Sequence, residues 1–321
     1  MSRSVRIVCL LGAFAAGNAC SLKTYAINMV GDALSSGDSV YESDEDIELV
    51  GSALPFGLKL TESLLAQSPR HSGLLLTACR GFTLYSYAYV AYEAERTAET
   101  DLDRARVLRA RARRLYLRAF QYGIRGIERA YPRFGDALLK DSKAAVARFR
   151  SKDTARDLPF IYWTAASLGL AISVSTDDAA MLARLPDVQA LLDRALALDE
   201  TWDEGALHEF CVVLAGATPG AAPDVATIKK HYDRAVELSR GKSASVHLAY
   251  AEAVSVPQQK GAEFRDLIAR ALAVDADSEP NNRLVNQLAH RRARWLESRA
   301  DELIINDEFI NDELKNDEPK P

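Results

Sequence analysis

Aromatic residues recur at helical spacing in the first half of the chain and could bind a ligand. The set comprises Phe82, Tyr85, Tyr89, Tyr92, Tyr122 and Trp163. Its first four members are three, four and three residues apart, which places them on one face of a helix. Tyrosine and tryptophan join an apolar ring to a polar group, so these residues could line a pore for a small hydrophobic ligand. The alternative is ordinary packing in a helical core.

Motifs of enzyme catalysis are absent from this sequence. It has no GxxxxGK[ST] or GxGxxG phosphate loop, no GxSxG nucleophile turn and no paired-cysteine metal spacing. His208-Glu209 is not followed by a second histidine one helical turn later, as a zinc-binding helix requires, and the other histidines are isolated. Cys79 and Cys211 lie in apolar helical patterns, which favours buried free thiols over a disulfide. We therefore expect a non-enzyme without catalytic residues, metal or cofactor.

The N-terminus has the layout of an export signal. Arg3 and Arg6 precede an apolar run over residues 7–16, and Gly17, Asn18 and Ala19 lead to Cys20. The run is too short to span a bilayer, so residues 1–19 are interpreted as a signal peptide. A cysteine after a small residue at this point is typical of a bacterial lipoprotein, although Gly17 stands where leucine is usual. We expect a periplasmic protein attached to the membrane only through a lipid on Cys20, the alternative being an ordinary signal peptide.

Charge is nearly balanced except at the C-terminus. The chain has Lys+Arg 40 against Asp+Glu 45, and the net charge of −5 argues against a nucleic-acid partner. Residues 301–321 carry 8 acids and 2 lysines in a five-residue repeat that matches neither helix nor strand period. We predict a disordered acidic tail over 301–321, which serves for solubility or binds a partner. Residues 20–300 are expected to form one all-α domain.

Arginines cluster in one predicted helix. Apolar residues from Ala105 to Ala119 recur at helical spacing, and arginines between positions 104 and 118 occupy the flanks of that apolar face. One interpretation is a solvated flank that pairs with acids elsewhere in the chain. The other is a basic face that binds an anion or a partner.

A six-residue phrase recurs in the second half of the chain. RALALD at 194–199, RAVELS at 234–239 and RALAVD at 270–275 begin 40 and 36 residues apart. Helical-hairpin repeats of the tetratricopeptide (TPR) class have a period of roughly 34 residues, and stacking of hairpins buries the face that one hairpin leaves open. The pattern predicts an all-α fold, a helical-hairpin array with degenerate TPR-like repeats. In each repeat the phrase should end a second helix, with its alanine packed between helices.

Several segments resemble one protein family in order and spacing. They are residues 43–90 (beginning SDEDIELVGSALPFGLKL), 111–128 (RARRLYLRAFQYGIRGIE), 205–210 (GALHEF), 231–241 (HYDRAVELSRG) and 271–296. Together they resemble the T component of TPR-associated TRAP transporters, the TatT family, over residues 22–300. The acidic tail is not a feature we associate with this family.

The resemblance implies a periplasmic lipoprotein that forms a homotrimer and has no catalytic residues. It further implies binding to the periplasmic substrate-binding protein of the transporter, the P component, and a pore that passes a small, hydrophobic ligand. The alternative function is a structural or assembly lipoprotein of the cell envelope that transports no ligand.

Overall fold

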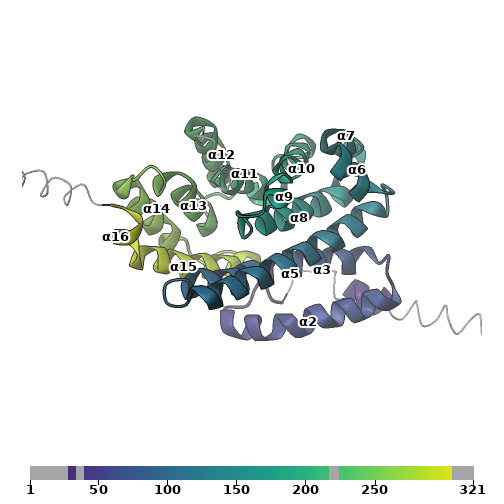
Figure 1. The fold of residues 1–321 in the computed structure, drawn as a ribbon, viewed down its shortest axis with the longest axis horizontal. Helices are drawn as coiled ribbons and strands as arrows, with labels where there is room; N and C mark the ends of the chain where they lie inside the picture. Colours follow the sequence, from purple (N-terminus) through teal and green to yellow (C-terminus); the bar gives the residue numbers. More distant parts are fainter. Residues whose placement is uncertain (1–27, 34–39, 217–223, 306–321) are drawn as a thin grey trace, which may run out of the picture. The chain divides into compact units, whose positions relative to one another are not determined.

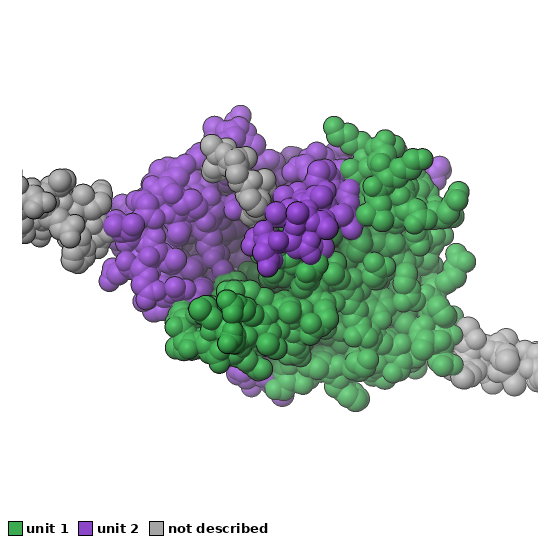
Figure 2. Space-filling model, viewed as in Figure 1, with its two compact units in different colours: residues 1–37, 51–148, 155–175 green, residues 38–50, 149–154, 176–321 purple. Residues whose placement is uncertain are grey.

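The computed structural model describes residues 28–33, 40–216 and 224–305, and every regular element within these ranges is a helix (Figure 1). The predicted all-α fold is confirmed. The chain divides into two compact units, shown in different colours in Figure 2. Unit 1 comprises residues 1–37, 51–148 and 155–175, and unit 2 comprises residues 38–50, 149–154 and 176–321. The predicted signal peptide, Cys20 and residues 306–321 of the tail lie outside the described residues.

Unit 1 is formed by long helices and their connecting turns. They are α2 (Ile47–Gln67, whose first turn belongs to unit 2), α3 (Ser72–Tyr85), the π-helix η1 (Ser86–Ala91), α4 (Tyr92–Thr97), α5 (Leu102–Glu128), α6 (Phe134–Lys140), α7 (Ser142–Val146) and α8 (Thr154–Ser173). Helices α3, η1 and α4 follow one another without a break. The carboxylate of Asp101 caps α5 by accepting from the Arg104 backbone N–H.

Helix α5 is the central element of unit 1. It packs along α3, η1 and α4, and its buried face includes Ala105, Ala112 and Ala119, which have no solvent exposure. Towards its end the helix faces α8 across a glycine. A Cβ atom on Gly126 would lie 2.0 Å from Cε1 of Phe160, so only glycine allows this approach. The predicted helix over 105–119 is therefore confirmed, and small residues position its neighbours.

The described residues of unit 2 form shorter helices. They are η2 (Ser151–Asp153), α9 (Ala179–Leu182), α10 (Leu185–Leu198), η3 (Trp202–Gly205), α11 (Ala206–Gly216), α12 (Val225–Leu238), α13 (Ala244–Tyr250), the π-helix η4 (Ala251–Ser255), α14 (Gly261–Ala273), η5 (Pro280–Asn282), α15 (Arg283–Ser298) and α16 (Ala300–Leu303). The last helix includes the first residues of the predicted tail.

The recurring phrase marks the ends of three helices in unit 2. The phrases at 194–199, 234–239 and 270–275 contain the last turns of α10, α12 and α14. Their alanines, Ala195, Ala235 and Ala271, are fully buried. Neighbouring helices pack in sequence, α11 on α12, α13 on α14 and α14 on α15. The predicted helix ends and buried alanines are confirmed, while assignment of these hairpins to the TPR class stays a prediction.

Candidate functional site

Four of the six predicted aromatic residues lie together in unit 1, where α3 and η1 contact α2 and α5. We call Phe82, Tyr85, Tyr89 and Tyr122 the aromatic row. The ring of Phe82 stacks on that of Tyr122 with centroids 6.0 Å apart, and Tyr85 stacks on Tyr89 at 5.7 Å. Tyr89 reaches α2 at Gly51, where a Cβ atom would lie 2.4 Å from its Cε1. The row therefore joins three helices of the unit.

A carboxylate from α2 fixes the Tyr122 end of the aromatic row. Tyr122 donates its hydroxyl hydrogen to Oε1 of Glu62 at 2.6 Å. Arg118 Nε lies 2.5 Å from the same oxygen, and Lys59 Nζ lies 2.7 Å from Oε2. Burial opposes ionisation of Glu62, but the hydrogen bonds of Lys59 and Tyr122 and the charge of Arg118 outweigh it, so its pKa lies below the usual value. Burial, followed by this carboxylate, raises the pKa of Tyr122.

Arginines of α5 cover the rings of the aromatic row. The guanidinium carbon of Arg118 lies 5.0 Å from the Phe82 ring centroid, and that of Arg125 lies 5.2 Å from Tyr122. Arg111 lies 5.9 Å from the Tyr85 ring and donates from Nη2 to its hydroxyl at 3.3 Å. These distances are typical of cation–π contacts. The α5 arginines thus hold the rings in place as well as carrying charge.

Tyr92 and Trp163 have their own partners among the described residues. Arg96 lies 5.8 Å from the Tyr92 ring, one helical turn further along α4. Trp163, on α8, packs edge-on against Tyr162 at 5.0 Å and receives Arg80 of α3 over its ring at 5.5 Å. Between Tyr85 and Tyr92 the chain forms the π-helix η1, whose wider turn changes the helical register of the residues that were predicted to share one face.

Phe82 is less exposed to solvent than the other five aromatic residues of the predicted set. Phe82 is buried, with 4% of its surface exposed, and belongs to the core of unit 1. The other members, Tyr85, Tyr89, Tyr92, Tyr122 and Trp163, are half-buried. A half-buried ring with a polar tip can both pack against its own helix and contact a ligand.

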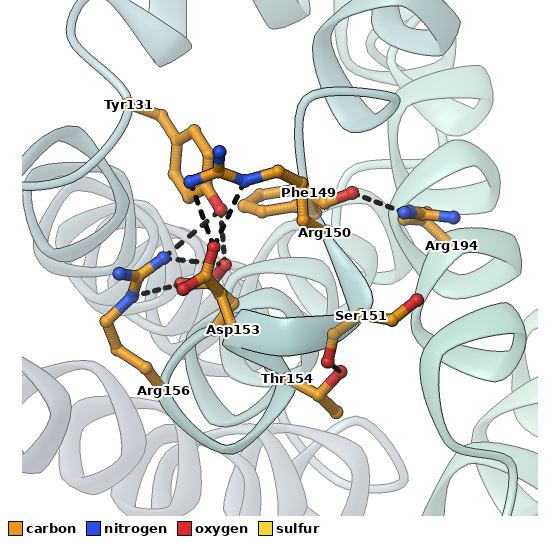
Figure 3. Close-up of polar contacts among 9 residues, drawn as sticks. Tyr131, Phe149, Arg150, Ser151, Asp153, Thr154, Arg156 and Arg194 are labelled. Carbon is orange, nitrogen blue, oxygen red and sulfur yellow. Dashed lines mark hydrogen bonds and ion pairs between the residues drawn. The ribbon is translucent and has the colours of Figure 1, made fainter.

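A second polar cluster of unit 1 carries a buried acid. Tyr131 donates to Oδ2 of Asp157 at 2.5 Å, and Arg156 donates from Nε to Oδ1 at 2.6 Å. Figure 3 labels Tyr131 and Arg156 of this cluster. Figure 3 also shows two contacts of unit 2, Arg150 with Asp153 and Arg194 with the carbonyl of Phe149. Both Tyr131 and Arg156 bind the carboxylate of Asp157, so this cluster stabilises the fold. Sequence reasoning missed this cluster, because Tyr131 and Asp157 are 26 residues apart.

Two histidines that are isolated from each other in the sequence lie side by side in unit 2. Nδ1 of His208 on α11 lies 2.9 Å from Nδ1 of His231 on α12. Nε2 of His208 lies 3.3 Å from Glu200, which also pairs with Arg234 at 2.6 Å. Burial lowers the pKa of both histidines. Two neutral rings can share one hydrogen in this geometry, so the pair links the two helices of a hairpin. The only signal in the sequence is the predicted antiparallel hairpin itself.

A surface cavity of about 250 Å³ lies beside α12, α13 and α14 in unit 2. Its lining includes the rings of Tyr232 and Tyr250, 4.6 Å apart, with Lys229, Asp266 and Arg270 among the charged groups. Lys229 pairs with Asp233, and Arg270 pairs with Asp266. These two pairs each lie within one helix, while Glu263 of the lining accepts a hydrogen bond from Ser255 of η4.

Several further sequence predictions can be compared with the described residues. No group of three or more His, Cys, Asp or Glu side chains there could hold a metal ion. Cys79 and Cys211 are free thiols, as predicted, but only Cys79 is buried, whereas Cys211 is half-buried. Burial raises the pKa of both thiols, that of Cys211 to about 12. Within the same ranges, each helix is too short or too polar to cross a bilayer.

Comparison with known proteins identifies the class of this helical protein. Residues 43–304 match the sequence model of the TRAP transporter T-component family, which spans both units. The chain belongs to the TRAP transporter T-component family, whose members are accessory proteins of TRAP transporters. It is also similar to an uncharacterised protein of Treponema pallidum (strain Nichols), with 28% identity over 271 residues that cover 83% of each chain. The family resemblance seen in the sequence is confirmed.

Proposed function

We propose that this protein is a non-enzymatic periplasmic accessory of a TRAP-type transporter that docks the transporter's substrate-binding protein, the P component. The match of residues 43–304 to the T-component family carries the proposal. An all-helical scaffold suits the role, because packed hairpins present a broad rigid surface to a partner. Neither a metal nor a catalytic cofactor has a part in it.

We further propose that the aromatic residues bind a small hydrophobic organic ligand on its way to or from the P component. Tyr85, Tyr89, Tyr92, Tyr122 and Trp163 are half-buried, so each has surface left for a ligand. The aromatic row contains two stacked pairs of rings, Phe82 with Tyr122 and Tyr85 with Tyr89. Apolar lining with a few polar groups is typical of small-molecule sites.

We also propose a location and an assembly for this protein, which the N-terminal sequence and the family resemblance support. Residues 1–19 act as the signal peptide, Cys20 carries the lipid that anchors the protein, and three copies assemble into a homotrimer. The order of basic, apolar and small residues before Cys20 supports the anchor. The membrane is contacted only through this lipid, and nucleic acid is not a partner.

The test is native mass spectrometry of residues 21–321, which lack the signal peptide and the lipidated Cys20, with the P component of the same transporter. We expect a homotrimer alone and a defined complex after mixing. Extraction of the complex into organic solvent should release a small apolar molecule. A chain that binds envelope-assembly proteins in place of the P component would support the alternative, a structural lipoprotein scaffold, and would refute the proposal.

A further inference from the structure

The solvent face of α5 carries an unusual arrangement of charge. Between Arg104 and Ile127 the helix has eight arginines and no Lys, Asp or Glu. The acids that flank this stretch are already engaged. Asp101 caps the helix, Asp103 pairs with Arg106 at 2.8 Å, and Glu128 accepts from the Gly135 N–H at 3.1 Å. Apart from Asp103, which pairs with Arg106, the helix therefore supplies no carboxylate that could neutralise its own arginines.

Seven exposed side chains of α5 fall on one straight line along the helix. This arginine stripe consists of Arg104, Val107, Arg111, Arg114, Arg118, Gln121 and Arg125, all of which are exposed. Their spacing of three and four residues alternates, so they lie above one another on one face. Twenty-one residues of helix extend about 30 Å. Five positive charges thus follow a single edge of unit 1.

The arginines of the stripe differ in how firmly they are held. Arg111, Arg118 and Arg125 lie over aromatic rings and donate to Tyr85, Glu62 and the Pro69 carbonyl, respectively. The side chains of Arg104 and Arg114 form no ion pair within residues 28–33, 40–216 and 224–305. Like charges three or four residues apart destabilise a helix, so this pattern does not serve the stability of α5.

We infer that the arginine stripe of α5 is the surface that docks an acidic face of the P component. The inference rests on the proposed function, which supplies the identity of the partner. Arginine presents a planar fork that binds a carboxylate through two parallel hydrogen bonds, and arginine with tyrosine is enriched at protein interfaces. Aromatic rings hold three of the five guanidinium groups in place. The stripe is therefore complementary to a surface whose carboxylates have a matching spacing.

An anionic membrane is the competing occupant, and the structure favours a protein. A helix that lies on a membrane inserts its apolar face between the lipids. The apolar face of α5, with Leu108, Tyr116 and Ile124, is buried inside unit 1. Val107 is the apolar residue that the stripe exposes. The fixed spacing of the arginines also has no counterpart in a fluid lipid surface.

The test uses the double variant Arg104→Glu/Arg114→Glu in the mature chain. Both side chains are exposed and lie over no ring of the aromatic row, and their replacement removes repulsion between like charges, so the thermal midpoint should not fall. The matched control is Arg265→Glu/Arg294→Glu, which makes the same change of charge at exposed positions of α14 and α15. Binding to the purified P component is measured by surface plasmon resonance at about 50 to 300 mM NaCl, a range over which screening increases strongly.

Wild type and control should bind equally, with an affinity that falls as salt rises. The stripe variant should bind about tenfold more weakly at low salt, mainly through a slower association rate, and should depend less on salt. If wild type, control and stripe variant all bind the P component with equal affinity, the inference is wrong while the proposed docking stands. If wild type does not bind the P component, the proposed function fails as well.

The same variants distinguish a membrane from a protein partner. Phosphatidylcholine vesicles with and without phosphatidylglycerol serve as the probe in a flotation assay. We expect wild type and the stripe variant to behave alike on both vesicles. Binding to phosphatidylglycerol vesicles that the stripe variant loses, with no change in affinity for the P component, would overturn the inference and make the stripe a lipid-binding surface.

Discussion

The contact of Tyr122 with Glu62 allows a quantitative test of how the aromatic row is held. Replacement of Tyr122 by Phe preserves the ring that stacks on Phe82 and removes only the hydroxyl that donates to Oε1 at 2.6 Å. Replacement of Glu62 by Gln keeps the shape of that side chain and removes its charge. The two single variants and the double variant form a double-mutant cycle, which isolates the interaction between the two side chains.

The expected magnitudes follow from the surroundings of Glu62. A hydrogen bond to a charged group contributes roughly 1.5–3 kcal/mol, and we expect about 1.5 kcal/mol for Tyr122→Phe because Arg118 and Lys59 still bind the carboxylate. The side chains of Arg118 and Lys59 are 44% and 68% exposed, so water replaces much of what they lose. Glu62→Gln should therefore cost about 1 kcal/mol. The double variant should lose about 1 kcal/mol less than the sum of the single variants.

The measurement is urea unfolding of the four proteins at pH 7, followed by circular dichroism. Glu297→Gln, at an exposed position of α15, is the control and should leave the free energy of unfolding unchanged. The pKa of Glu62 lies below its usual value in the folded chain, so its contribution is present above pH 4.5 and is lost as the pH falls through the lowered pKa. Strictly additive losses at pH 7 would refute the pairing of the two side chains.

Three further predictions concern other parts of the chain. Gly126→Ala should destabilise unit 1 by about 1–3 kcal/mol in urea unfolding, because the Cβ atom of the alanine would lie 2.0 Å from Phe160. An alanine usually stabilises a helix relative to glycine, so an increase in stability would contradict this packing. Burial raises the pKa of Glu209 to about 7, so wild type loses stability as the pH rises from 4.5 through 7; Glu209→Gln should raise the melting temperature at pH 8 and leave it unchanged at pH 4. Cys79 is buried and its pKa is raised, so it should react with a thiol reagent at pH 8 only after unfolding; rapid labelling of Cys79 in the native chain would exclude its burial, and the half-buried Cys211 should react faster than Cys79.

The sequence predicts best those features that repeat at short range. The phrases ending in α10, α12 and α14 are recognisable because a small residue must recur wherever two helices approach closely, and Ala195, Ala235 and Ala271 occupy those positions. The apolar face of α5 is equally evident from its period of three and four residues. In both cases the pattern lies within one helix and needs no knowledge of the partner helix.

Contacts across helices leave no comparable signal in a single sequence. Glu62 and Tyr122 are 60 residues apart, and His208 and His231 are 23 residues apart, so neither pair belongs to one local motif. The spacing of Phe82, Tyr85, Tyr89 and Tyr92 predicts one aromatic face, but the π-helix η1 changes the register after Tyr85. Serine and threonine side chains that bond the carbonyl four residues earlier, such as Ser86 to Phe82, accompany this change.

Three arginines of the stripe lie over rings of the aromatic row, and this decides how the roles of row and stripe can be separated. Arg111, Arg118 and Arg125 each cover a ring of the row and also lie on the stripe. A change at any of them would alter ring packing and surface charge together, so a loss of binding would have two causes. Arg104 and Arg114 carry the charge without a ring, which is why their replacement isolates docking. Conversely, Tyr122→Phe changes the row without changing the charge of the stripe. If the row binds a ligand and the stripe binds the protein, Arg104→Glu/Arg114→Glu should weaken the affinity for the P component and Tyr122→Phe should leave it unchanged.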